Sequence, residues 1–153
     1  MRKIDQLLGE YGESHQNKLN KTIHWICVPL IVFSVIAILW AVPLPFVTGQ
    51  FFNLGALLLV LTLIYYLRLS FTLFVGMIIY AALCIGAIFF IQGITTTPIW
   101  LVGIIIFVLA WVGQFYGHKV EGKKPSFLKD IQFLLVGPAW LMHFIFKKAG
   151  IPY

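Results

Sequence analysis

The chain has 153 residues, of which 61% are hydrophobic and only 10% are charged, and its formal net charge is +6. A soluble globular domain averages about 45–50% apolar and about 25% charged residues. The apolar excess lies in long blocks, which excludes a water-soluble core, and the length allows one domain. We therefore expect residues 1–153 to form a single integral membrane domain.

The charges indicate which partners the chain can bind, and the cysteine positions indicate the state of the thiols. Positive charge in a membrane protein reports orientation and contact with anionic headgroups, so membrane lipids are expected partners. No basic patch is interleaved with aromatic residues in the way that single-strand binders require, so we expect no nucleic-acid partner. Cys27 and Cys84 lie inside apolar segments without a CxxC spacing, which predicts buried thiols.

The first 21 residues are polar and carry the pattern of a helix that lies on a membrane surface. They contain Asp5, Glu10 and Glu13 and lack the apolar core of a secretory signal. We therefore expect the first apolar segment both to target and to anchor the chain. The apolar residues that recur at amphipathic-helix spacing are Ile4, Leu7, Leu8 and Tyr11.

Four apolar segments follow that approach the roughly 20 residues needed to cross a hydrocarbon core as helix. We expect these spans over Ile23–Trp40, Phe51–Leu67, Phe71–Ile91 and Ile99–Phe115. Pro43 and Pro45 favour an extended turn after the first segment. Residues 68–70 are expected to form a tight turn between the second and third segments, and residues 92–98 a second turn before the fourth.

Lysine and arginine positions predict the orientation of these segments. Basic residues occur in residues 2–21, at Arg68 and in residues 118–130, whereas the turns at 41–50 and 92–98 carry none. By the positive-inside rule, the three basic segments are cytoplasmic.

The last apolar stretch, Ile131–Phe146, differs from the other four. Its 16 residues would reach only about 24 Å as helix, and Gly137-Pro138 interrupts it. A fifth full span would also place Lys147 and Lys148 outside, against the positive-inside rule. We expect an all-α polytopic bundle of four transmembrane helices, an N-terminal amphipathic helix and a C-terminal interfacial or re-entrant hairpin; five spans is the alternative.

The four histidines fall close to the cytoplasmic side. His15 precedes the first span, His24 lies at its start and His118 follows the fourth. His143 joins them if the last stretch is re-entrant. Imidazole is the commonest metal ligand and serves zinc, iron, copper and nickel, so this convergence predicts a site for a divalent transition metal. The alternative is that each histidine is a solvated interfacial anchor.

An acidic residue lies beside one of these histidines. Glu121 follows His118 by three residues, so one helical turn presents both to the same point. It is then either a metal ligand or an acceptor for an imidazole N–H. The alternative is a solvated ion pair with Lys119 or Lys124, which would contribute little energy.

At these residues the sequence resembles a known family. The two runs that carry the resemblance are Tyr11…His15…Asn20…His24…Pro29 and Trp111…Gln114-Phe115…Gly117-His118…Glu121…Pro125. They closely resemble the two signatures of the 2-hydroxy fatty acid dioxygenase family of small membrane proteins, which acts in alpha-oxidation during phytosphingosine breakdown. The resemblance covers most of the chain. The compact ending through Gly137-Pro138-Ala139-Trp140 is similar to that of the bacterial branch.

The resemblance implies an Fe(II)-dependent dioxygenase that uses O2 to convert 2-hydroxy long-chain fatty acids to the acid one carbon shorter plus CO2. Carried over by position, the iron ligands would be His15, His24 and His118, with His143 as a candidate fourth ligand. Glu121 matches the acidic position of the family, which implies a catalytic role for its carboxylate.

The alternative function is a non-enzymatic small transporter or lipid-binding scaffold with structural or pH-sensing histidines. Transporters keep ionisable groups near the bilayer midplane, at broken helices. The midplane segments here hold essentially none, which favours the enzyme. The absence of a targeting signal and the compact ending favour a bacterial inner membrane, with the N-terminus and the histidines on the cytoplasmic side. Composition sets no oligomeric state.

Overall fold

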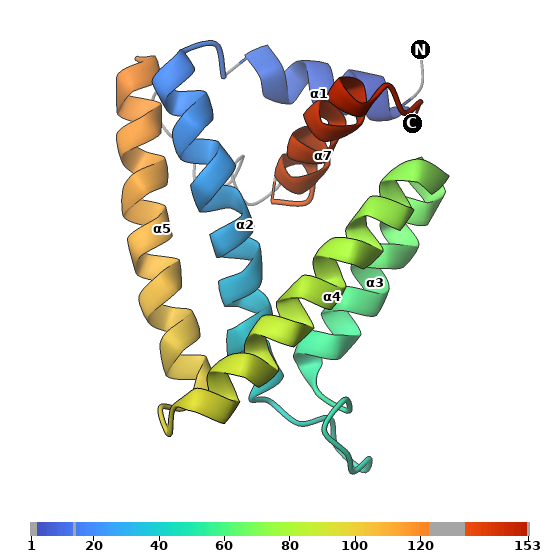
Figure 1. Cartoon of the computed structure of the whole chain (residues 1–153), viewed down its shortest axis with the longest axis vertical. Coiled ribbons are helices and arrows are strands. Elements are labelled where there is room, and N and C mark those ends of the chain that lie inside the picture. The colour runs from blue at the N-terminus through green and yellow to red at the C-terminus, as the bar shows by residue number, and fades with distance from the viewer. Residues whose placement is uncertain (1–2, 14, 123–133, 153) are drawn as a thin grey trace.

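The computed structural model describes residues 3–13, 15–122 and 134–152. Within these ranges the chain forms six helices and no strand (Figure 1), which confirms the all-α prediction. The helices are α1 (Lys3–Glu13), α2 (Lys18–Trp40), α3 (Leu54–Leu69), α4 (Phe71–Ile94), α5 (Ile99–Glu121) and α7 (Val136–Ala149).

Three of these helices are long and apolar enough to cross a membrane. They are α2, α4 and α5, with 23, 24 and 23 residues, and they support an integral membrane protein. Helix α3 is equally apolar, but its 16 residues reach only about 24 Å, less than the roughly 30 Å of a hydrocarbon core. The count of four spans therefore stays a prediction.

Helix α7 turns back toward the end of the molecule at which α2 begins and α5 ends (Figure 1). It has 14 residues, or about 21 Å, and its last turn carries Lys147 and Lys148. Pro138 lies in its first turn, where the missing N–H removes no helical bond. The interfacial or re-entrant hairpin stays a prediction, because residues 123–133, which would begin it, lie outside the described ranges.

The N-terminal segment divides where the sequence predicted one continuous helical stretch over residues 1–21. Helix α1 ends at Glu13, and α2 begins at Lys18 after Asn17. The Asn17 side chain accepts a hydrogen bond from the backbone N–H of Leu19 at 2.8 Å. An asparagine side chain competes with the helical backbone for such donors and so starts a new helix. The break places His15 in a short loop.

The amphipathic face of α1 is covered by protein. Ile4, Leu8 and Tyr11 are buried in one cluster with Trp140 and Ala139 of α7. The predicted apolar stripe is therefore real, but its partner within the chain is α7.

The long helices pack as two pairs, α2 with α5 and α3 with α4. Only Ser70 separates α3 from α4, and its side chain accepts from the Leu73 N–H at 3.4 Å. The predicted tight turn is therefore present but shorter than residues 68–70, because Arg68 and Leu69 belong to α3. The two pairs diverge toward the end at which α1 and α7 lie (Figure 1). Cys27 and Cys84 are free and buried, as predicted.

Candidate metal centre

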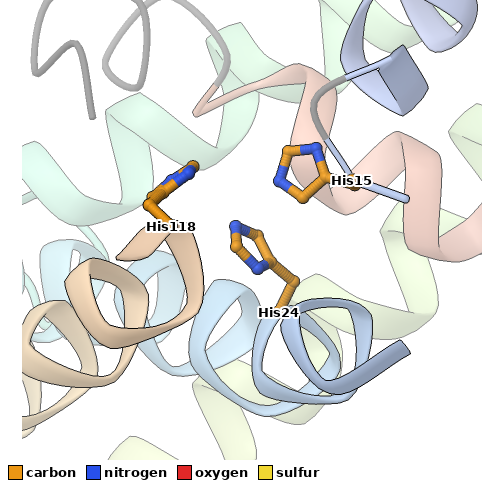
Figure 2. A group of neighbouring side chains, drawn as sticks. All are labelled: His15, His24 and His118. Carbon is orange, nitrogen blue, oxygen red and sulfur yellow. The ribbon is translucent and has the colours of Figure 1, made fainter. Parts of the chain in front are cut away.

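Three of the four histidines come together from three separate segments. His15 lies in the loop between α1 and α2, His24 near the start of α2, and His118 in the last turn of α5. Their side chains are 3%, 1% and 7% exposed, and they point toward one another (Figure 2). One candidate ligand atom from each lies within 4.8 Å of the others. We call this group the histidine trio.

Backbone carbonyls orient two of the three rings. The Nδ1 atom of His15 lies 2.6 Å from the carbonyl oxygen of Tyr11, and that of His24 lies 2.9 Å from the carbonyl oxygen of Asn20. A carbonyl oxygen only accepts, so each Nδ1 carries the proton and donates it. Each Nε2 then keeps a lone pair, which is the tautomer that a metal ion requires.

Aromatic packing holds the same rings from the side. The His15 ring stacks on Tyr11 with centroids 4.2 Å apart and an interplanar angle of 11°. The His24 ring meets His15 edge-on at 4.2 Å and His118 at 5.2 Å. Together these ring contacts hold the three imidazoles at fixed positions relative to one another.

Glu121 joins the end of α5 to the loop that carries His15. Its carboxylate accepts from the backbone N–H of Gln16 at 2.8 Å and of Asn17 at 3.0 Å. It also accepts from the Asn20 side-chain amide at 2.9 Å. Glu121 is not part of the ligand group found among the described residues. Its catalytic role stays a prediction, and its contacts are those of a residue that positions the trio.

Close approach of α2 and α5 sets the distance between His24 and His118. A Cβ added to Gly117 would lie 2.4 Å from Asn20 Oδ1, and one added to Gly113 would lie 2.6 Å from Cys27 Sγ. A side chain at either point of α5 would therefore have to displace the facing side chain of Asn20 or Cys27. Small residues at a helix interface allow this kind of backbone approach in membranes.

His143 lies on α7 beside Phe144, with ring centroids 5.1 Å apart. Partial burial lowers its pKa, Lys147 lowers it further, and Asp5 opposes both effects. The predicted role of His143 as a fourth ligand stays a prediction, because the ligand group found among the described residues contains only the trio.

A small cavity opens beside the trio. It has a volume of about 30 Å³ and is lined by His24, His118, Gln114, Tyr11 and apolar residues that include Leu134. A cavity of this size admits a molecule as small as water. Gln114 is only 7% exposed, and its side-chain oxygen has no hydrogen-bond partner among the described residues. A buried amide oxygen of this kind is suited to receive a donor from a ligand.

Sequence reasoning assigned no role to Gln114 or Asn20, although both belong to the two quoted runs. Gln114 precedes His118 by four residues, a spacing that puts both on one helix face. That spacing is the signal that would have found it. Asn20 precedes His24 by four residues and joins it to Glu121 through its carbonyl oxygen and its amide.

The donor set fits a transition metal. Three buried imidazoles suit iron, zinc, copper or nickel, and two of them, those of His15 and His24, make the second hydrogen bond that ligating histidines almost always make. The trio contains no thiolate or carboxylate, which argues against the sites preferred by calcium and magnesium.

The sequence was compared with known proteins. Residues 1–149 match the family described as 2-hydroxy-palmitic acid dioxygenase Mpo1-like. The chain is 32% identical to the 2-hydroxy-palmitic acid dioxygenase MPO1 of Saccharomyces cerevisiae over 150 residues, which cover 95% of this chain and 81% of the yeast protein. No solved structure matches it. These similarities support a dioxygenase role. The chain belongs to the Mpo1-like family.

Proposed function

We propose that the chain is a membrane-embedded, Fe(II)-dependent dioxygenase that shortens 2-hydroxy long-chain fatty acids by one carbon. The observation that carries the proposal is the histidine trio, whose candidate ligand atoms lie within 4.8 Å of one another. Membership of the Mpo1-like family supplies the substrate class, because the yeast relative is named for 2-hydroxy-palmitic acid.

Iron is the metal that matches this reaction. His15, His24 and His118 would hold it. Bound there, Fe(II) would supply the redox chemistry toward O2 and a binding point for the hydroxy acid, which zinc, having no accessible redox change, would not supply in full.

The overall reaction needs no further reductant. A 2-hydroxy acid and one O2 give the acid one carbon shorter, CO2 and water, with every atom accounted for. The substrate supplies all four electrons that O2 takes up. A 2-oxo acid cosubstrate or NADH is therefore unnecessary, and the sequence carries no glycine-rich dinucleotide fingerprint.

The protein side chains around the cavity would orient the substrate. The buried side-chain oxygen of Gln114 is placed to accept a hydrogen bond from the 2-hydroxyl group. The apolar walls contributed by Val28, Ile31 and Leu134 limit the water that can reach the reacting carbon. Glu121 would hold the His15 loop in place through the Gln16 and Asn17 N–H groups.

The site would lie on the cytoplasmic side of a membrane, in our proposal a bacterial inner membrane. Lys18 and Lys21 on α2, Lys119 on α5 and the lysines that end α7 all belong to the helix ends near the trio. The positive-inside rule favours that orientation, and it would let the substrate enter with its carboxylate among basic side chains.

The test is a reconstitution of the purified protein in detergent. The protein is loaded with Fe(II) and incubated with 2-hydroxy-palmitic acid with and without O2, and the product is identified by mass spectrometry. We expect the fifteen-carbon acid and one CO2 per O2 consumed, only in the aerobic sample. No shortened acid from protein that has bound iron would refute the proposed activity.

A further inference from the structure

A second cavity, which is apolar, lies deeper in the bundle than the trio. It has a volume of about 70 Å³ and is lined by residues of α2, α3, α4 and the start of α7. Its lining residues include Val32, Ile36, Leu59, Ala81 and Leu134. We call this cavity the apolar slot.

Three described side chains that line the slot carry hydroxyl groups, Thr62, Tyr66 and Tyr80, and the two tyrosine hydroxyls are engaged elsewhere. The Tyr66 hydroxyl donates to the carbonyl oxygen of Leu135, and the Tyr80 hydroxyl donates to that of Pro29 at 2.7 Å. What these two tyrosines present to the slot is therefore ring surface. A cavity with such walls favours hydrocarbon over water.

The slot adjoins the cavity of the metal centre. Leu134 lines both of them, and the consecutive residues Gly137 and Pro138 line one each. Along α2, Val28 lines the cavity at the trio and Val32 lines the slot, so one helical turn, about 6 Å, separates the two linings. A molecule with a polar head and an apolar tail would span them.

The slot has a shallow end and a deep end. Tyr66 and Met77 belong to the buried cluster that contains Val28 and the residues of α1 and α7 near the trio. Ile36 belongs to the cluster at the other end of α2, and Leu59 packs against that cluster. Ile36 follows Val28 by eight residues on α2, so the deep end of the slot lies roughly 12 Å along the helix from the lining of the cavity at the trio, at 1.5 Å per residue.

We propose that the apolar slot binds a segment of the hydrocarbon tail of the 2-hydroxy acid while the head lies at the trio, with Leu134 at the junction and Leu59 at the deep end. This inference rests on the proposed function and adds a prediction of its own: the depth of the slot sets the chain-length preference.

The experiment fills the deep end and measures kcat/KM over a series of saturated 2-hydroxy acids of increasing length. Leu59→Trp is compared with Leu61→Trp, which makes the same change on the same helix at a residue 56% exposed on the outer surface. Each methylene that loses its place in the slot costs about fourfold. We expect Leu59→Trp to lower kcat/KM for the longest acids at least about tenfold and to leave kcat/KM for the shortest acids unchanged. Leu61→Trp should keep the wild-type dependence of kcat/KM on chain length.

A binding arm separates failure of the slot from failure of the proposed function. Palmitic acid, which lacks the 2-hydroxyl group, is added at fixed detergent concentration, and the rise in Tm is measured for wild type, Leu59→Trp and Leu61→Trp. We expect palmitic acid to raise the Tm of the wild type and of Leu61→Trp and to leave the Tm of Leu59→Trp unchanged. If Leu59→Trp does not fold, Leu59→Ala replaces it, and its preference is expected to shift toward longer acids.

Each remaining outcome decides one of the two claims. An unchanged chain-length profile in the folded Leu59 variants, or an equal loss at every length, overturns the slot. If the wild type turns over no acid of any length, the proposed function fails and the binding arm alone decides the slot. An equal rise in Tm with palmitic acid in Leu59→Trp and Leu61→Trp overturns the proposal that the slot binds the tail.

Discussion

The two helix pairs of the bundle differ in what they hold. Helices α2 and α5 carry His24 and His118 and approach so closely that Gly117 has no room for a Cβ atom. Helices α3 and α4 carry no histidine, are joined at Ser70, and contribute apolar side chains to a cavity. We infer that the proposed metal centre depends on a fixed spacing between the backbones of α2 and α5, whereas the proposed tail site depends on apolar volume.

Substitutions in the first pair are therefore expected to change metal binding, and substitutions in the second pair to change substrate selection.

Loss of a trio imidazole is expected to have the largest effect. His15→Ala, His24→Ala and His118→Ala should each lower turnover by more than about 100-fold, because removal of a ligand costs more than removal of its hydrogen-bond partner. Turnover is measured in detergent, and membrane extraction and helical circular dichroism confirm folding. Wild-type turnover in one of the three would remove that residue from the ligand set.

Glu121→Ala should weaken iron binding by about 10- to 100-fold, the range for residues that orient metal ligands. The substitution removes the acceptor for the Gln16 and Asn17 N–H groups, so the loop with His15 loses its anchor to α5. Iron affinity is measured by competition with a chromophoric chelator, and Glu121→Gln, which retains one acceptor oxygen, should lose less. Abolished turnover at wild-type iron affinity would instead assign Glu121 a direct catalytic role.

Gly117→Ala tests the close approach of α2 and α5. The added Cβ would lie 2.4 Å from Asn20 Oδ1, so we expect a destabilisation of about 1–3 kcal/mol, as for overpacking elsewhere. Gly86→Ala on α4 is the matched control, because a Cβ there meets nothing within 4 Å, and its stability should stay level or rise. Both are measured by thermal unfolding in detergent; equal Tm values in the two variants would count against a tight interface.

Gln114→Leu removes the buried amide oxygen beside the trio. The loss of one neutral hydrogen bond to the substrate hydroxyl should lower kcat/KM about 2- to 10-fold, with iron affinity unchanged. Gln114→Glu retains an acceptor oxygen and should recover part of the loss. A parallel loss of bound iron in Gln114→Leu would show that the side chain supports the metal ligands and does not contact the substrate.

His143→Ala should have the smallest effect. The residue lies outside the trio, beside Phe144 on α7, so iron content and turnover should change by less than about twofold, as for substitutions away from a site. Metal analysis and turnover of the purified variant check this. Loss of iron comparable to that of His24→Ala would restore His143 as a ligand.

Sequence reasoning predicted the helices better than the packing between them. Hydropathy located α2, α4 and α5, and Ser70 marked the turn before α4, because both depend on local composition. The break at Asn17 was missed, since a capping asparagine inside a polar helical pattern changes little in periodicity. The contact of α1 with α7 was also missed, because an amphipathic stripe does not reveal whether lipid or protein covers it.

The candidate site was also predictable only in part, because some of its features follow from positions along the chain and others from packing between helices. The convergence of His15, His24 and His118 followed from topology, since all three lie at helix ends that the positive-inside rule places on one side. The tautomers, the Glu121 contacts and the buried oxygen of Gln114 depend on side-chain distances across α2 and α5, which spacing along the chain does not contain.

The most direct test of the account is the iron stoichiometry and coordination of the purified protein after Fe(II) loading. Elemental analysis combined with X-ray absorption at the iron edge is applied to wild type and His24→Ala. We expect one iron per chain with imidazole scattering in wild type, and loss of that iron in His24→Ala. Wild-type protein without bound iron, or His24→Ala with the same iron content and coordination as wild type, would contradict the account.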